Sequence, residues 1–124
     1  MSDEDEIKEF VKNYIEVLNT GKTKFVEKNV DIEAMYAKDG EIYGNWGLSK
    51  KMDVKKYEDQ FKNQTLFYMK KGWDKKFEFE SVEFKDDEAI IKINAEGQKN
   101  QGQPLILKKI KGKWKLIWIP QWGF

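Results

Sequence analysis

The spacing of apolar side chains changes once along this chain, near Gly72, and that change limits the folds it can adopt. Before Gly72 apolar residues recur every three or four positions, as they do on one face of a helix; after it they alternate, as they do in strands. Helices followed by strands predict an α+β architecture with an antiparallel sheet. A chain of 124 residues has room for one such unit, so we expect residues 1–124 to form a single domain.

The helical half divides into four expected helices. The first begins at Ser2, whose hydroxyl can cap it, and ends at Thr20–Gly21. Thr23 is expected to cap a second, short helix, and Asp31 a third that ends at Asp39–Gly40. A brief strand and a turn are expected over residues 41–48. The next long helix starts at Asp53 and ends near Lys71–Gly72, with an apolar stripe of Val54, Tyr57, Phe61, Thr65 and Tyr68.

The second half predicts four strands in an antiparallel meander. Alternation over residues 77–84 changes phase at Ser81, which indicates a bulge there. A turn over residues 85–88 leads to a strand whose inward row is Ala89, Ile91, Ile93 and Ala95. A polar loop over residues 96–103 precedes a strand at residues 105–107. A turn at Lys111–Gly112 then leads into the last strand, with Trp114, Leu116 and Trp118 in alternation.

Composition excludes several kinds of chemistry. The chain has no cysteine and no histidine, so disulfides, zinc sites built on sulfur and histidine bases are ruled out. All 23 basic residues are lysine and balance 22 acidic ones, which favours no nucleic-acid partner. The lysines of residues 108–115 are interpreted as protection of a sheet edge. We expect no metal, no cofactor and no transmembrane segment, since no apolar run approaches about 18 residues.

Three segments carry a resemblance to a known superfamily. Residues 11–21, residues 31–42 and residues 111–116 resemble the first helix, the approach to the first strand and the closing hairpin of the nuclear transport factor 2-like superfamily. The resemblance implies a strongly curved, mostly antiparallel sheet that wraps the N-terminal helices into a cone with a pocket at its open end.

The enzymes of that superfamily supply a test of function. The resemblance to ketosteroid isomerases places their tyrosine at Tyr14, their base at or beside Gly44 and Asn45, and their second acid near Ile106. Only Tyr14 has the required chemistry. The histidine of related cyclases and dehydratases is absent. We therefore expect no catalytic residues.

What remains is an aromatic-rich pocket fold without an acid–base set. The leading hypothesis is a non-catalytic binding module for a small apolar molecule or a peptide segment. The expected ligand-binding residues are aromatic: Tyr14, Tyr36, Tyr43, Tyr57, Phe61 and Trp118. For Tyr14 the alternative is a core aromatic, and for Asp39 a turn residue.

Two other functions stay open at this point. One is an enzyme that uses Tyr14 with a carboxylate, Asp39 or Glu41. The other is a protein-interaction or envelope-associated domain that acts through its sheet face or its apolar tail, residues 119–124. A homodimer through the convex face of the sheet is expected. The location is cytoplasmic if the chain is complete, and periplasmic or cell-surface if a signal segment has been removed.

Overall fold

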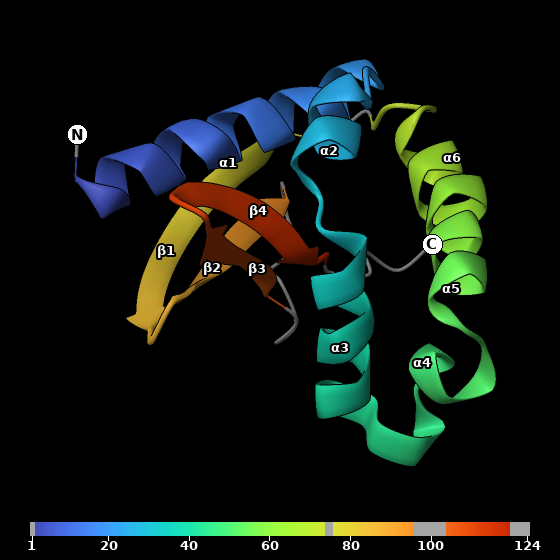
Figure 1. Cartoon of the computed structure of the whole chain (residues 1–124). Coiled ribbons are helices and arrows are strands. Elements are labelled where there is room, and N and C mark those ends of the chain that lie inside the picture. The colour runs from blue at the N-terminus through green and yellow to red at the C-terminus, as the bar shows by residue number, and fades with distance from the viewer. Residues whose placement is uncertain (1, 74–75, 96–103, 120–124) are drawn as a thin grey trace.

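The second half of the chain forms the sheet that alternation predicts. A computed structural model describes residues 2–73, 76–95 and 104–119, and it has an α+β architecture in which helices precede a four-stranded antiparallel sheet (Figure 1). The strand order is β1-β2-β3-β4, with β1 and β4 at the two edges. The predicted fold class is confirmed. The strands are β1 (Phe77–Lys85), β2 (Glu88–Ala95), β3 (Leu105–Ile110) and β4 (Lys113–Trp118).

Strand register follows the predicted pattern closely. Phe79 pairs with Ile93 and Ser81 with Lys92, so Glu80 is the extra residue of a bulge at the predicted place. The predicted inward row of β2 is buried along its whole length. The expected loop at residues 96–103 and the part of the apolar tail at residues 120–124 lie outside the described residues.

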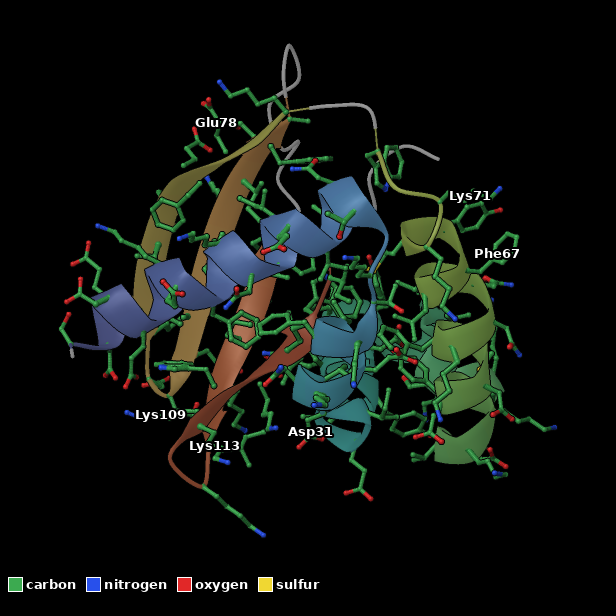
Figure 2. All side chains as sticks on the ribbon, turned by 90° about the horizontal axis from the view of Figure 1, so that it is seen from above. Asp31, Phe67, Lys71, Glu78, Lys109 and Lys113 are labelled. Atoms are coloured by element: carbon green, nitrogen blue, oxygen red, sulfur yellow. The ribbon has the colours of Figure 1, made fainter. Side chains whose placement is uncertain are left out.

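The first helix, α1 (Asp3–Thr20), begins and ends where predicted. The Oγ of Ser2 accepts a hydrogen bond from the backbone N–H of Asp5 at 3.2 Å, and Gly21 closes the helix with a φ of 73°. A side chain at Gly21 would collide with the backbone carbonyl of Lys70, so glycine lets the end of α1 lie against the end of the later helix. Figure 2 shows α1 crossing the strands, where its apolar stripe packs on the inward rows.

Two further helices follow, α2 (Lys24–Asn29) and α3 (Ile32–Tyr43). The Oδ1 of Asp31 accepts the N–H of Ala34 at 2.9 Å, which confirms the predicted cap. Thr23 precedes α2 as predicted, but its hydroxyl donates to Glu27 at 3.2 Å instead of capping the helix. Between the helices, Val30 forms a parallel bridge with Leu116, so this linker lies along the outer edge of β4.

The end of α3 differs from the prediction, and the expected strand over residues 41–48 is wrong. The helix runs through Asp39–Gly40 to Tyr43, and Gly44 ends it with a φ of 57°. A single 3₁₀ turn (Gly44–Trp46) and the short helix α4 (Leu48–Lys51) follow. Lys38 and Asp39 are both buried in tertiary contacts, and this packing overrides the local tendency of Asp-Gly to turn.

The last helical segment contains one residue more than a regular helix would. It comprises α5 (Val54–Gln60), the π-helical segment η2 (Phe61–Thr65) and α6 (Leu66–Met69), and the Oδ1 of Asp53 caps it by accepting the N–H of Lys56 at 2.8 Å. Beyond Phe61 the buried side chains are those of Leu66 and Met69, each one residue later than predicted. The π turn inserts that residue and rotates the stripe.

Helices pack on both faces of the sheet, but α3 covers its far face only near β4. Alternation points Ile106 and Ile117 away from α1, and there they pack with Ala34 of α3. Thus α3 covers the far face of the sheet near β4, while α5 and α6 lie beyond α3 (Figure 1).

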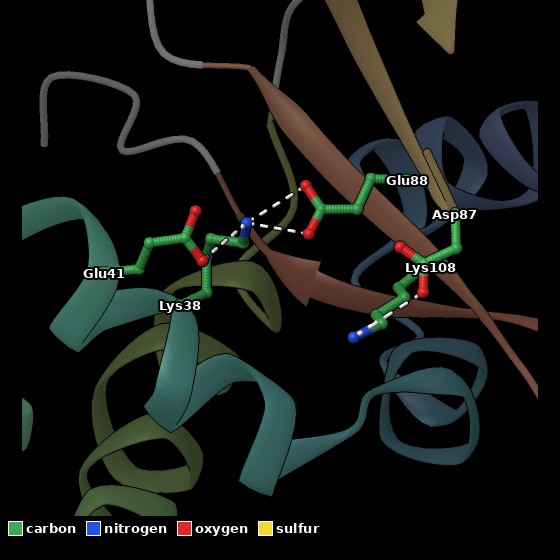
Figure 3. A network of polar contacts seen from close by, with 5 residues as sticks. All are labelled: Lys38, Glu41, Asp87, Glu88 and Lys108. Atoms are coloured by element: carbon green, nitrogen blue, oxygen red, sulfur yellow. Dashed lines mark hydrogen bonds and ion pairs between the residues drawn. The ribbon is translucent and has the colours of Figure 1, made fainter. Parts of the chain in front are cut away.

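A buried lysine ties α3 to the sheet. The Nζ of Lys38 lies between Glu41 of the same helix, at 3.2 Å, and Glu88 at the start of β2 (Figure 3). Burial alone would lower the pKa of Lys38, but the hydrogen bonds and charges of Glu88 and Glu41 outweigh it and raise that pKa. Lys38 therefore remains charged inside the fold.

Candidate functional site

A pocket of about 380 Å³ lies among the helices, next to the end of β4. Its walls come from α1, α3, the 3₁₀ turn and the α5–α6 segment, and β4 contributes Trp118 at its end. The volume falls at the lower end of the range of about 300–1,000 Å³ that is typical of small-molecule sites. The lining includes Tyr14, Asp39, Tyr43, Trp46, Gly47, Tyr57, Gln60, Phe61, Gln64, Tyr68 and Trp118.

The pocket has a buried floor and an open mouth. Tyr14, Tyr57 and Phe61 are buried, and they give the floor an aromatic surface. Trp46, which the 3₁₀ turn carries, is 88% exposed although it lines the pocket. An exposed tryptophan beside an apolar cavity is typical of a contact surface. The mouth is therefore a place where a bound molecule would reduce solvent exposure of apolar rings.

Five of the six residues expected at the site line this pocket. Tyr14, Tyr57 and Phe61 belong to the floor, whereas the rings of Tyr43 and Trp118 contact each other with centroids 5.6 Å apart. These five come from α1, α3, the α5–η2 segment and β4, so the fold brings together residues that are far apart in sequence.

Tyr36, the sixth, lies behind the pocket wall and not in it. Its ring packs edge-on against Tyr57, with centroids 5.5 Å apart. Its hydroxyl donates to the backbone carbonyl of Ser49 at 2.9 Å, and so links α3 to α4. Tyr36 therefore contacts a lining residue, Tyr57, without lining the pocket itself.

The structure adds lining residues that sequence patterns did not indicate. Gln60 and Gln64 follow Tyr57 by three and seven residues, both line the pocket, and the Nε2 of Gln60 donates to the Oε1 of Gln64 at 2.8 Å. Trp46 was missed because it belongs to no apolar stripe. Its one sequence signal is its place in Gly44-Asn45-Trp46-Gly47, where a large ring stands in a segment of turn formers.

Tyr14 carries a hydroxyl without a hydrogen-bond partner in the described part of the chain. The side chain is 0% exposed, and its burial raises the pKa of the phenol. The hydroxyl is therefore protonated at neutral pH and can both donate and accept. A buried polar group left unpaired costs about 1–3 kcal/mol, so a ligand oxygen or nitrogen that pairs with it would recover free energy.

Asp39 brings the only charge to the pocket wall as the structure describes it. Its Oδ1 accepts the backbone N–H of Ser49 at 3.0 Å, and its side chain is buried. Gly47 lies directly against that oxygen, because a Cβ built at Gly47 would overlap it. The observed position of the Asp39 carboxylate therefore requires glycine at residue 47.

The charge of Asp39 affects the pKa of the Tyr57 hydroxyl. Tyr57 donates to the backbone carbonyl of Met35 at 3.4 Å. Burial raises the pKa of Tyr57, and the nearby charge of Asp39 and the phenol of Tyr43 raise it further. Asp39 therefore acts electrostatically within the pocket.

The enzyme hypothesis has only part of its geometry. Tyr14 and Asp39 line the same pocket, but no hydrogen bond joins them among the described residues. Glu41 is on the surface and pairs with Lys38, outside the lining. The described residues also contain no group of three or more acidic, histidine or cysteine side chains that could hold a metal ion, and no helix long and apolar enough to cross a membrane.

One comparison with known proteins gives a result. A family model described as "Putative lumazine-binding" matches residues 2–118. No curated protein and no solved structure matches the chain.

Proposed function

The chain belongs to the family described as "Putative lumazine-binding", and from that premise we propose that it is a non-catalytic module that binds a small, planar, largely apolar molecule in the pocket beside α3. The observation that carries this proposal is the combination of an aromatic floor with an open aromatic mouth. Rings contribute large contact area and prefer stacked or edge-on partners, which suits a flat ligand.

Lumazine itself is a fused two-ring heterocycle with carbonyl oxygens and N–H groups on its edge. The pocket offers matching polar groups in the amides of Gln60 and Gln64, and Tyr14, whose hydroxyl is buried and unpaired within the described chain, belongs to its floor. A few polar groups among apolar walls are what fixes a ligand's orientation in such a site. The ring pair of Tyr43 and Trp118 adds a stacking surface nearby.

The wider relationship belongs to the same proposal. We infer that this is a single nuclear transport factor 2-like domain whose catalytic positions have been lost. One apolar core extends through α1, the later helices and all four strands, which supports one folding unit. Gly44 and Asn45, the positions that the resemblance assigns to the isomerase base, fall in the 3₁₀ turn, and neither side chain can abstract a proton.

Calorimetric titration with lumazine tests the binding proposal. We expect saturable heat for the unaltered protein, and affinity weakened about tenfold by Trp46→Ala. Because Trp46 is exposed, this variant should unfold at the same urea concentration as the parent.

Phe67→Ala is the matched control for that variant. Phe67 is 53% exposed and points away from α3 on the outer side of α6 (Figure 2), so its removal should leave lumazine binding unchanged. Equal losses in both variants, or no saturable heat with the unaltered protein, would overturn the proposed function.

A further inference from the structure

We propose that Asp39 makes the pocket selective for ligands that present N–H donors, and against ligands that carry a negative charge. This inference rests on the proposed function, because it describes which small molecules the same pocket accepts. It goes further by assigning the selection to one residue and one chemical property.

No cation compensates the charge of Asp39 among the described residues that line the pocket. Among the residues that line the pocket in the described chain, Asp39 alone is charged. Lys38, its neighbour in sequence, directs its ammonium to Glu88 and Glu41 on another side of α3 (Figure 3). An anionic ligand would therefore meet a buried carboxylate with no lysine beside it to offset the repulsion.

The carboxylate of Asp39 can accept more hydrogen bonds than the described chain supplies. Ionised aspartate accepts through two oxygens with about four lone-pair positions. The described contacts use one of them, from the N–H of Ser49 to Oδ1. Asp39 can thus accept further N–H groups from a ligand, and two parallel hydrogen bonds to a carboxylate form a strong and directional pair.

Aromatic rings line the same pocket as Asp39. They include Tyr57, Tyr43 and Trp118, and the face of an aromatic ring carries the negative side of its quadrupole. These rings add to the preference that Asp39 sets, because an aromatic face attracts the electron-poor or N–H-bearing edge of a ligand and does not attract an anion. Burial raises the pKa of the Tyr57 phenol, and the nearby charge of Asp39 raises it further.

Two pairs of small molecules test the two preferences separately, one for N–H donors and one against negative charge. Pterin has an amino group next to a ring N–H, whereas lumazine has a carbonyl between two ring N–H groups, so the pair compares two adjacent donors with donors that a carbonyl separates. Neutral 6-hydroxymethylpterin and anionic 6-carboxypterin are close in size, so that pair compares charge. We expect pterin to bind at least threefold more tightly than lumazine, and 6-hydroxymethylpterin at least tenfold more tightly than 6-carboxypterin.

The variant Asp39→Asn tests whether the carboxylate of Asp39 causes these differences in affinity. Asparagine keeps an Oδ1 that can accept the N–H of Ser49, so the local fold has the same bond available. We expect both affinity ratios to fall close to one in this variant. Asp86→Asn is the matched control, because Asp86 is exposed in the β1–β2 turn and asparagine tolerates its φ of 57°. The control should retain both ratios.

The outcomes separate this inference from the proposed function. Binding of all four probes with equal affinity to the unaltered protein would overturn the role of Asp39 and leave small-molecule binding intact. Binding of none would overturn both. The ratios of the unaltered protein need no variant, so they decide the matter even if Asp39→Asn does not fold.

Discussion

The Nζ of Lys38 lies 3.0 and 2.8 Å from the two carboxylate oxygens of Glu88, which joins α3 to the start of β2 across 50 positions of sequence. The side chain of Lys38 is 7% exposed and that of Glu88 is 21% exposed. Breaking a buried ion pair by removing one partner is costly, because the other charge stays behind without compensation.

We expect Lys38→Met to lower the free energy of unfolding by about 2–4 kcal/mol, measured by urea denaturation. The double variant Lys38→Met with Glu88→Leu should recover part of that loss, since no lone charge remains. Lys62→Met is the control: its pair with Glu58 is exposed, so the change should stay within about 0.5 kcal/mol. Equal effects at the two lysines would contradict the buried role of Lys38.

The raised pKa values of Lys38, Tyr14 and Tyr57 predict loss of stability in alkali. In each case the folded protein holds its proton more tightly than the unfolded chain does. The stabilisation is therefore complete below about pH 10, and it is lost as the pH rises through the folded-state values. Urea midpoints between pH 7 and pH 11 should be level at first and then fall. Tyr57→Phe should make that fall shallower.

Tyr14→Phe should separate stability from binding. The variant removes a buried hydroxyl that lacks a partner within the described chain, so at pH 7 we expect stability to rise by about 1 kcal/mol. Lumazine affinity should drop, because the ligand loses that partner. Lower stability together with unchanged affinity would show that the hydroxyl serves the fold alone.

Gly47→Ala should disturb Asp39. The backbone at Gly47, with a φ of −79°, suits alanine, but the added Cβ would overlap the Oδ1 of Asp39. We expect a loss of about 1–3 kcal/mol in urea denaturation and weaker pterin binding. Gly112→Ala adds the same group where no atom lies within 4 Å, at a φ of 79°. It should cost stability through the backbone alone and leave binding unchanged.

Deletion of Asn63 should convert the π-helical segment to a regular helix. The exposed Asn63 lies inside η2, and its removal would place the side chains of Leu66 and Met69 four and seven residues after Phe61, in regular helical spacing. We expect a folded protein with reduced lumazine binding, because Gln64 would move relative to the pocket. Deletion of Lys12 from the regular helix α1 is the control. It should unfold the domain, since half of that helix would rotate its apolar stripe away from the core.

The sequence indicated the parts of the fold that local periodicity controls. The extent of α1, the caps at Ser2 and Asp31, the helix start at Asp53, and the bulge at Ser81 all follow from patterns within a few residues. The region after Asp39 could not be predicted this way. There, burial of Asp39 and the ion pair of Lys38 depend on β2 and α4, which are distant in sequence.

The candidate site shows the same division. Aromatic residues on apolar stripes, such as Tyr14 and Phe61, were expected at the pocket and do line it. Gln64 was missed because the expected site residues were chosen for their aromatic rings, although it lies three residues after Phe61 and seven after Tyr57, which is one face of a regular helix. Tyr36 was expected at the site because its type fits, yet its direction depends on a hydrogen bond to Ser49.

The bridge between Val30 and Leu116 has a consequence for assembly. Together with the bond from the N–H of Asp31 to the carbonyl of Leu116, it occupies the outer edge of β4 with the chain's own backbone. Among the described residues the middle of the β4 edge is therefore covered at Leu116, whereas no described segment pairs with the outer edge of β1, so strand addition is favoured at β1. Two copies that paired through their β1 edges would form one continuous sheet with a β4 strand at each end, where the chain's own linker already covers Leu116.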